Sequence, residues 1–341
     1  MRDLRKNPLQ IGILGCGSFL LRRVLPVVKH METVKIVAIQ NRDLEKAKKI
    51  ALEYNIPHAV SHREDLVEKS EVEAVHIASP NFLHEEDALA CAAARKPTLC
   101  EKPLSTSLES VRKMIAAFED RSLPFFVGQH LRFKPAIHKA KELLENGELG
   151  QLLHLRAYYY SQTIPADNWR LKKGNGGGAL QEIGIHLVDL IHFITGEEIS
   201  SAHAIAMPVQ DGESERMVAF QGQLPSGATA SFECAFERPY YNGFELIGTK
   251  SRLVSRESLR QTSEPIETLS LISATGKEHS ITLEPCDLYV EEFKHFAEAV
   301  THNIPTPISA NIALASQRVI DHAYRTMTAS LKKNREALLQ I

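Results

Sequence analysis

The first third of the chain alternates short apolar runs with amphipathic segments, and this alternation limits the possible fold more than any other feature. Apolar runs at residues 9–14, 34–40, 74–78, 98–100 and 124–128 predict buried strands. Helices are expected between them, over residues 18–29, 44–54, 84–94 and 108–120. Strands that alternate with helices indicate a parallel, doubly wound α/β sheet of the Rossmann type.

A pair of glycines, Gly15 and Gly17, stands between the first predicted strand and the first helix. This arrangement aims backbone N–H groups at a phosphate, so Gly15, Gly17 and the following Ser18 and Phe19 are predicted to contact a dinucleotide. The third glycine of the dinucleotide fingerprint is replaced by Leu20. That glycine serves helix–sheet packing more than phosphate contact, so the prediction survives its loss.

Two more loops leave the carboxyl ends of predicted strands, where ligands of such sheets bind. The first is Ser79-Pro80-Asn81, followed by His84, and the second is Glu101-Lys102-Pro103. We expect the three loops to converge on one cofactor. His84 has a second interpretation, as a residue that simply starts the next helix.

The end of the second strand indicates which nicotinamide cofactor is bound. An acidic residue there would bind the ribose hydroxyls of NAD, but the chain has Asn41 and Arg42. Asn41 would not repel a phosphate, and Arg42 can pair with one in bidentate fashion. NADP is therefore preferred over NAD. Asp43 could turn back to the ribose, but we favour a role as the cap of the following helix.

Residues 176–196 form an apolar run that begins with three glycines and ends at Gly196, which predicts a buried helix with a glycine cap. Glu182, His186 and Asp189 interrupt it at spacings i, i+4 and i+7, and therefore lie on one face. Burying charges without partners is expensive. The stripe is thus a hydrogen-bond network in the core, a metal site or the wall of a functional site, and we favour the last.

The pattern changes after Gly128. A helix over residues 138–145, a strand over 152–161, strands over 218–224, 228–236 and 244–247, and helices over 288–301 and 312–330 are expected, followed by a polar tail at 331–341. Turns at Pro225-Ser226-Gly227 and Asn242-Gly243 predict antiparallel neighbours. The chain is therefore expected to divide into a Rossmann domain, residues 1–128, and an α+β domain, residues 129–341.

Bulk properties exclude several function classes. The net charge is −2 (40 basic minus 42 acidic residues), without a long basic run, so nucleic acid is not an expected partner. The five cysteines include no Cys-x-x-Cys pair, which favours reduced thiols in the cytoplasm. The amino-terminal residues show no signal peptide, and no apolar run is long enough to span a membrane.

Several motifs together resemble the Gfo/Idh/MocA family of NAD(P)-dependent oxidoreductases, and they occur in the family's order over nearly the whole chain. The motifs are Gly15-Cys16-Gly17, Ser79-Pro80-Asn81-Phe82-Leu83-His84, Cys100-Glu101-Lys102-Pro103, Arg132-Phe133-Lys134-Pro135, Gly176-Gly177-Gly178-Ala179-Leu180, Gly184-x-His186-x-x-Asp189 and Glu245-Leu246-Ile247-Gly248-Thr249-Lys250. None is decisive alone, but the ordered set is specific.

The resemblance implies a Rossmann domain followed by an α+β domain whose large, mostly antiparallel sheet forms homodimers or homotetramers. It implies hydride transfer between nicotinamide and a hydroxyl or carbonyl carbon of a sugar, cyclitol or related small molecule. By the same resemblance Lys102 contacts the reacting oxygen and His186 acts in acid–base catalysis. Glu182 stands where the family usually has Asp, which changes the reach of the carboxylate by one methylene group.

The chemistry of the side chains agrees with these roles. His186 suits proton transfer because an unperturbed imidazole has a pKa of about 6.5, and Lys102 can donate to a developing alkoxide or serve as an alternative base. Glu182 would orient His186 or bind a hydroxyl group. Further candidates for the substrate wall are Arg132, Tyr158, Trp169, Arg170, Asp189 and Tyr240.

Two other functions compete with this prediction. A metal enzyme would use Glu182, His186 and Asp189 as ligands, although one helix supplies few convergent groups. A cofactor-binding sensor would bind NADPH without turnover, although the presence of both Lys102 and His186 argues against it.

Overall fold

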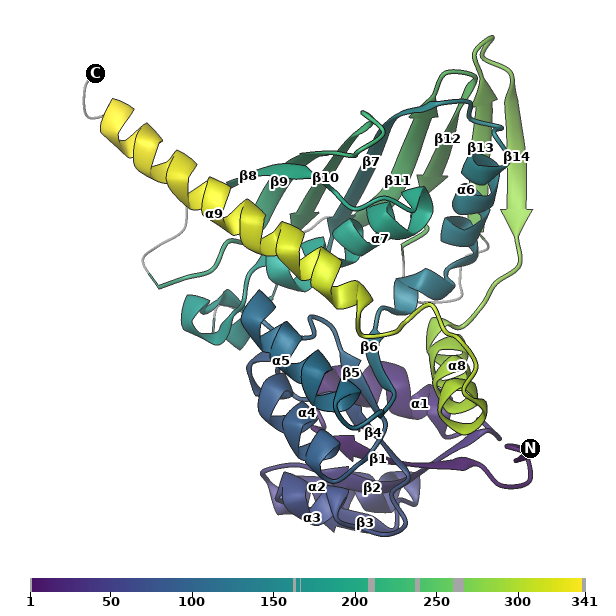
Figure 1. Ribbon diagram of the computed structural model, residues 1–341, viewed down its shortest axis with the longest axis vertical. Coiled ribbons are helices and arrows are strands. Elements are labelled where there is room, and N and C mark those ends of the chain that lie inside the picture. The colour runs from purple at the N-terminus through teal and green to yellow at the C-terminus, as the bar shows by residue number, and fades with distance from the viewer. Residues whose placement is uncertain are drawn as a thin grey trace. The chain divides into compact units, whose positions relative to one another are not determined.

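Figure 1 shows the computed structural model, which describes residues 2–161, 164–165, 167–207, 212–236, 240–259 and 267–338. The chain divides into two compact units. The first contains residues 1–130 and 287–314, and the second contains residues 131–286 and 315–341. Residues 287–314, expected in the second domain, thus belong to the first unit, because the apolar face of their helix packs on its sheet.

The first unit is built on a six-stranded parallel sheet in the order β3-β2-β1-β4-β5-β6. This order is that of the Rossmann fold, so the predicted α/β class is confirmed. The strands are β1 (Leu9–Leu14), β2 (Val34–Gln40), β3 (His58–Val60), β4 (Ala74–Ile77), β5 (Thr98–Glu101) and β6 (Phe125–Gly128). The short strand β3 was not predicted, because its three half-buried residues carry no apolar pattern.

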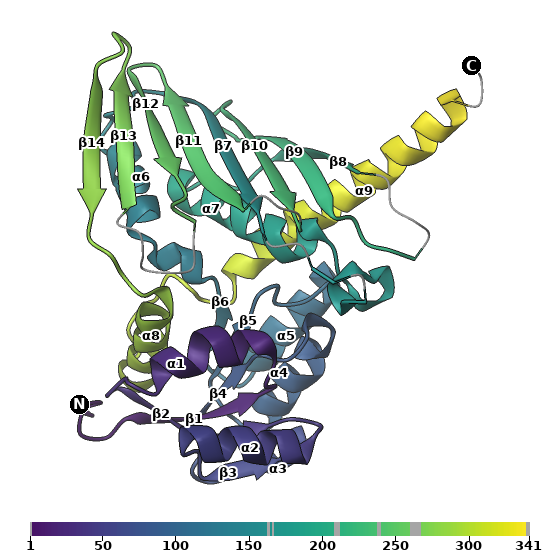
Figure 2. The ribbon, with the colours of Figure 1, turned by 180° about the vertical axis from the view of Figure 1, so that it is seen from behind.

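Helices cover both faces of this sheet (Figure 2). One face packs an apolar core against α3 (Arg63–Val67), α4 (His84–Ala93) and α5 (Leu108–Glu119). The helices α1 (Leu25–Val28) and α8 (Leu288–His302) pack together near the other face. Burial of strands on both faces explains why they read as continuous apolar runs.

The local signals at the helix ends are confirmed where the sequence predicted them. Helix α2 (Leu44–Tyr54) begins after Asp43, whose carboxylate accepts the N–H of Lys46 at 3.1 Å. The helix after the glycine pair contains a π-helical turn, Leu20–Val24, before α1. This wider turn starts at the buried Leu20, the position where the fingerprint has its third glycine.

The second unit holds an eight-stranded sheet in the order β14-β13-β12-β11-β7-β10-β9-β8. All neighbouring pairs are antiparallel except β7 and β10, which are parallel. The predicted α+β class with a large, mostly antiparallel sheet is therefore confirmed. The strands are β7 (Leu152–Tyr160), β8 (Ser201–Ala206), β9 (Met217–Gln223), β10 (Thr229–Ala235), β11 (Tyr241–Gly248), β12 (Ser251–Arg256), β13 (Glu267–Ser273) and β14 (Glu278–Leu283).

One predicted turn is wrong. Pro225-Ser226-Gly227 does join β9 to β10, with Gly227 N–H donating to the Leu224 carbonyl at 2.9 Å. Asn242-Gly243, however, lies inside β11, which pairs with β7 and β12 and not with β10. Its glycine is required by packing: a Cβ at Gly243 would meet the Ser255 carbonyl oxygen and lie 2.6 Å from the Tyr158 hydroxyl.

Helices of the second unit lie on one face of its sheet (Figures 1 and 2). They are α6 (Pro135–Glu145), the π-helical turn Leu180–Gly184 that runs into α7 (Ile185–Thr195), and α9 (Ile312–Leu338). The polar tail predicted from residue 331 is wrong as far as Leu338, because α9 continues through it; residues 339–341 lie outside the described residues. Among the described helices, none is long and apolar enough to cross a membrane.

Candidate functional site

Three loops meet at one edge of the first unit's sheet, as predicted from the strand order. Strands β1, β4 and β5 are neighbours, so the loops that leave their carboxyl ends are adjacent. Ala78 N–H donates to the Leu14 carbonyl at 2.8 Å, and a Cβ at Gly15 would lie 2.6 Å from the backbone nitrogen of Ser79. With its φ of +90°, Gly15 can be only glycine without strain.

His84 ties two of these loops together. Its Nδ1 lies 2.9 Å from the Pro103 carbonyl oxygen, and its Nε2 lies 2.9 Å from the Ser79 carbonyl oxygen. Carbonyl oxygens only accept, so an imidazolium satisfies both bonds and a neutral ring satisfies one. The side chain is 1% exposed, and its ring nitrogens face the backbone instead of the predicted dinucleotide. His84 is also the first residue of α4, so the interpretation that it starts the next helix is confirmed, and its predicted contact with the cofactor stays a prediction.

The glycine turn is open at Gly17. Gly17 and Ser18 are exposed, and a Cβ at Gly17 would meet nothing within 4 Å. Leu21 N–H donates to the Gly17 carbonyl at 3.3 Å, which marks the first helical turn and leaves the N–H groups of that turn facing outward. Phe19 packs edge-to-face on Tyr289 at 5.7 Å between centroids, which anchors the turn.

The end of β2 presents the side chains predicted to choose the cofactor. Arg42 is exposed and makes no ion pair among the described residues. Asn41 donates from Nδ2 to Cys16 Sγ at 3.4 Å, and its Oδ1 accepts the N–H of Asp43 at 2.9 Å. Asp43 itself caps α2 as predicted, so its carboxylate is engaged by the helix.

Glu101 and Lys102 diverge at the end of β5. The Glu101 carboxylate lies on the inner face of the sheet, 3.2 Å from His76 Nε2, and Glu101 is 7% exposed. Lys102, the next residue, is half-buried, and the Lys102–Pro103 peptide bond is cis. The Glu101 side chain is oriented toward the interior of the unit, and its predicted contact with the cofactor stays a prediction.

The predicted polar stripe of the second unit is present, but its two carboxylates are paired with arginines. Arg170 donates from Nε to Glu182 Oε2 at 2.9 Å and lies over the Trp169 ring at 4.4 Å. Arg132 makes a bidentate pair with Asp189, through Nε and Nη2, each at 2.8 Å. Asp189 is thereby committed to a buried ion pair, which favours the structural role over direct substrate contact.

His186 is 3% exposed, in the first turn of α7. Glu182 lies in the preceding π-helical turn, so the regular α-helical spacing assumed from the sequence does not hold across the two residues. No group of three or more His, Cys, Asp or Glu side chains in the described part of the chain is arranged to hold a metal ion.

The tyrosines of β7 alternate between the two faces of the sheet. Tyr159 is opposite Cys234, whose Sγ would lie 3.5 Å from a Cβ on Gly184, so Tyr159 is on the face that α7 covers. It makes an edge-to-face contact with Tyr240 at 6.2 Å. Tyr158 faces the opposite side and stacks on Tyr241 at 4.2 Å. Of the two neighbours, the unpredicted Tyr159 is thus the one on the stripe's side.

Comparison with known proteins identifies the chain. Residues 9–129 match the oxidoreductase family with an NAD-binding Rossmann fold, and residues 137–254 match the GFO/IDH/MocA C-terminal domain. A trans-1,2-dihydrobenzene-1,2-diol dehydrogenase of Mus musculus is 30% identical over 250 residues, which cover 72% of this chain and 73% of that protein.

The chain belongs to the Gfo/Idh/MocA family of oxidoreductases.

Other members of this family are similar over most of the chain. A 1,5-anhydro-D-fructose reductase of Ensifer adhaerens is 28% identical over 294 residues, covering 85% of this chain and 87% of the relative. Among solved structures, a mutant of the 3-ketoreductase KijD10 from Actinomadura kijaniata, in complex with TDP-benzene and NADP, superposes with a TM-score of 0.88. It is 22% identical and covers 94% of this chain and 98% of its own, which supports the fold.

Sequence reasoning missed Glu215, a buried residue that contacts the helical segment carrying Glu182, His186 and Asp189. Glu215 accepts the N–H of Leu180 at 3.0 Å and the hydroxyl proton of Tyr324 at 2.9 Å. Burial raises the pKa of the Glu215 carboxyl, and these two donors offset part of that rise. A Cβ at Gly178 would lie 2.7 Å from Glu215 Cδ, so the glycine run was the available signal for a buried partner.

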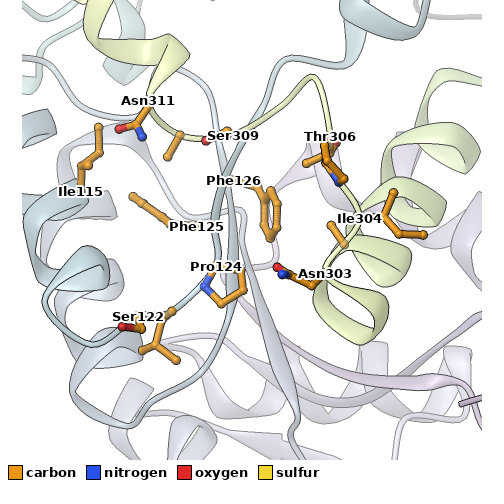
Figure 3. Close-up of a pocket in the computed structure, with 14 residues that line it drawn as sticks. Ile115, Ser122, Pro124, Phe125, Phe126, Asn303, Ile304, Thr306, Ser309 and Asn311 are labelled. Atoms are coloured by element: carbon orange, nitrogen blue, oxygen red, sulfur yellow. The ribbon is translucent and has the colours of Figure 1, made fainter. Parts of the chain in front are cut away.

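A surface pocket of about 450 Å³ in the first unit lies away from these loops (Figure 3). Pro124 and Phe125 line it at the amino end of β6, together with Asn303 and Ile304 after α8. Because cofactor loops leave the carboxyl ends of the strands, this pocket is at the other edge of the sheet. None of the predicted site residues lines it.

Proposed function

We propose that this oxidoreductase is an NADP-dependent dehydrogenase or reductase that transfers a hydride to or from a hydroxyl or carbonyl carbon of a sugar, cyclitol or related small molecule. The observation that carries the proposal is the set of three adjacent loops after β1, β4 and β5, with a side-chain-free turn at Gly15 and a lysine, Lys102, on the last loop. The named relatives, a fructose-derivative reductase and a diol dehydrogenase, support this substrate class.

The cofactor is held, in this proposal, by the glycine turn and by the end of β2. The N–H groups after Gly17 would bind the pyrophosphate, with Gly15, Ser18 and Phe19 shaping the turn. Ser79, Pro80 and Asn81 would border the nicotinamide half. Arg42 is exposed and unpaired among the described residues, whereas Asp43 is engaged as a helix cap, and this supports NADP over NAD.

The bound nicotinamide supplies the hydride chemistry. The protein must then manage one proton for each hydride, because oxidation of a CH–OH group removes both. Lys102 would donate a hydrogen bond to the reacting oxygen as it becomes alkoxide-like, and His186 would take the proton in oxidation and return it in reduction. Glu182 would bind a substrate hydroxyl while Arg170 holds its carboxylate in place.

The substrate wall would come from the second unit. The proposed wall includes two half-buried side chains, Trp169 and Arg170, and the exposed Tyr240. Aromatic and cationic groups of this kind bind hydroxylated ligands. Tyr159 joins this set in place of Tyr158. Arg132 and Asp189 would shape the wall as a pair without direct chemical roles.

Turnover tests the proposal directly. Oxidation of NADPH is followed with a panel of keto-sugars, and reduction of NADP⁺ with the corresponding alcohols, for the wild type, Lys102→Ala, His186→Ala and the double variant. Each single variant is expected to lower kcat by about 10²–10⁴-fold. If both act in one step, the double variant will lose less than the product of the two effects.

Two outcomes would contradict the proposal. Full turnover by Lys102→Ala would remove Lys102 from the chemistry. Tight NADPH binding, measured by nicotinamide fluorescence, without turnover on any sugar, cyclitol or keto-sugar would indicate a sensor.

Self-association through the second unit's sheet is also proposed. Figure 2 shows the face opposite α6, α7 and α9 without a helix over it in the described part of the chain. Arg156, Tyr160 and Glu233 form a hydrogen-bonded polar group on this face. Light scattering is expected to give a homodimer or homotetramer, and Tyr160→Asp to shift it toward the monomer.

The five free cysteines support a reducing compartment such as the cytoplasm.

A further inference from the structure

We propose that Glu292 is a positioning residue for the Glu101-Lys102-Pro103 turn: it remains protonated, so that the buried carboxyl groups of Glu292 and Glu101 together carry one negative charge. The inference rests on the proposed function of Lys102. It adds a residue from α8, far along the chain, that neither the sequence motifs nor the hydride chemistry required.

Glu292 lies in the apolar stripe of α8. Phe293 and Phe296 flank it on the buried side, and their rings contact His76 at 5.1 Å and Phe126 at 5.4 Å, so this stripe faces the inner side of β4 and β6. The Glu292 side chain is fully buried. A carboxyl group in such a stripe is unusual, because burying it as an ion without partners is expensive.

The two carboxyl oxygens of Glu292 have no hydrogen-bond partner among the described residues. An ionised carboxylate needs donors when it leaves water, whereas the neutral acid tolerates an apolar setting far better. Burial raises the pKa of Glu292 well above its ordinary value, and the negative charge of Glu101 raises it further. Glu292 is therefore the carboxyl group of the two that keeps its proton.

Glu101 is held in a different way. His76 Nε2 lies 3.2 Å from its Oε1. On the next strand Gly128 is opposite Glu101, and a Cβ there would lie 3.0 Å from Glu101 Oε2. The Glu101 carboxylate therefore has one polar partner, His76, and the backbone of Gly128 lies close to its other oxygen. In the proposal it carries the single charge of the pair.

Few other ionisable groups face this pair. His130 lies against the same helix through a ring contact with Tyr289 at 5.1 Å. Helix α1 contains no ionisable residue, and on β2 the only one is the exposed Lys35. On α8 itself, Glu291 and Lys294 are on the outer side, 3.7 Å apart. Tyr289 and His295 lie one turn before and one turn after Glu292 on α8. Glu101 is the charge that acts on Glu292.

If Glu292 lost its proton, the carboxylates of Glu292 and Glu101 would both be negatively charged next to the Glu101-Lys102-Pro103 turn. Like charges this close cannot both ionise without displacement, as in paired carboxylates of other sites. Any shift of Glu101 moves Lys102, its covalent neighbour. The proton on Glu292 thereby keeps the ammonium group of Lys102 in register with the reacting oxygen.

Infrared spectroscopy tests the proton itself without any substrate. At neutral pH the wild type is expected to show the C=O stretch of a buried protonated carboxylic acid, and Glu292→Gln to lose it. Glu291→Gln, a change of the adjacent half-exposed residue, is the matched control and should keep the band. Absence of the band in the wild type, or its persistence in Glu292→Gln, would overturn the proposal.

Alkaline stability gives a second readout. A group whose pKa is raised on folding contributes stability that is complete below its ordinary pKa, near 4.5, and lost as pH rises through the folded value. The Tm of the wild type should therefore fall from neutral to alkaline pH more steeply than that of Glu292→Gln. Parallel curves for the two proteins would contradict a raised, protonated Glu292.

Kinetics separate positioning from mere packing. Glu292→Leu keeps the volume and removes the polar group, and is expected to lower kcat about 10–100-fold with a smaller change in the KM for NADPH. Glu292→Gln should recover most of that loss and remove the alkaline limb of the pH profile. Equal damage in both variants would overturn the proposal. If the carboxylic acid band is present in the wild type and lost in Glu292→Gln, but the wild type shows no turnover, only the proposed function is contradicted.

Discussion

Two arginine–carboxylate pairs on the same helical segment of the second unit differ in how firmly they are held. Arg132 donates two hydrogen bonds to Asp189, and the side chains of Arg132 and Asp189 are 11% and 3% exposed. Arg170 binds Glu182 through a single hydrogen bond from Nε, and the Arg170 side chain is 36% exposed. Each guanidinium also lies over a ring, Phe193 at 5.0 Å and Trp169 at 4.4 Å.

The two pairs differ mainly in how far the arginine is exposed to water. A buried bidentate pair is rigid, and separating it would leave two charges in a low dielectric. In the other pair the Arg170 side chain is 36% exposed and can be hydrated, whereas the Glu182 side chain is buried, at 6%. The bidentate pair therefore fixes Asp189, and under the proposed function Glu182, whose arginine reaches water, is the carboxylate that would bind a substrate hydroxyl.

The largest expected effect comes from breaking the bidentate pair. Asp189→Ala should lower the free energy of unfolding by about 3–5 kcal/mol, because it leaves the Arg132 charge buried without its partner. Urea denaturation measures this. The control is Glu245→Ala, which breaks the exposed pair with Arg252 and should cost about 0–1 kcal/mol. Equal losses in both variants would show that the two settings do not differ.

A smaller stability effect but a clear kinetic one is expected at the second pair. Glu182→Gln should change the free energy of unfolding by about 1 kcal/mol, because the amide oxygen of Gln can still accept a hydrogen bond from Arg170. It should raise the substrate KM about tenfold, since a charge-assisted hydrogen bond is lost. Steady-state kinetics with the best keto-sugar measures it. Glu182→Asp keeps the charge but shortens the reach, so an unchanged KM there would refute the role given to side-chain length.

The smallest expected effects concern the two rings. Phe193→Leu should cost about 0.5–1 kcal/mol through the lost contact with Arg132, a value to be isolated by a double-mutant cycle with Arg132→Met. Lys141 also lies over this ring, at 5.6 Å, so Lys141→Met is the matched control. Trp169→Leu should affect stability less, because its arginine is already half in water. A larger loss at Trp169 would reverse the comparison.

Local sequence signals predicted the first unit closely. The helix cap at Asp43 and the strands 9–14 and 34–40 are found where apolar runs and capping chemistry placed them. These features depend on neighbours within a few residues, so the chain itself carries the information. The strands β3, β8, β12, β13 and β14 were missed, since the apolar residues in their sequences are few and polar residues such as Ser251 and Ser255 take buried positions.

The sequence predicted which residues form the candidate site, but it did not predict which side chains they pair with. The stripe of Glu182, His186 and Asp189 was visible, yet nothing in the spacing shows that Arg132 and Arg170 neutralise its carboxylates. Tyr158 and Tyr159 are adjacent in sequence, and only the strand register decides which one shares a face with α7. A shift of one residue along a strand moves a side chain to the other face.

By itself, the sequence determined the fold class, the glycine turn and the identity of the polar groups, because periodicity and backbone freedom are local properties. Tertiary structure alone decided their states: His84 braces two loops, Asp189 is locked by an arginine 57 residues earlier, and Glu292 is buried beside the inner end of β5. The physical reason is desolvation. The charge and partners of a buried group are set by what surrounds it, and those surroundings come from segments far apart in the chain.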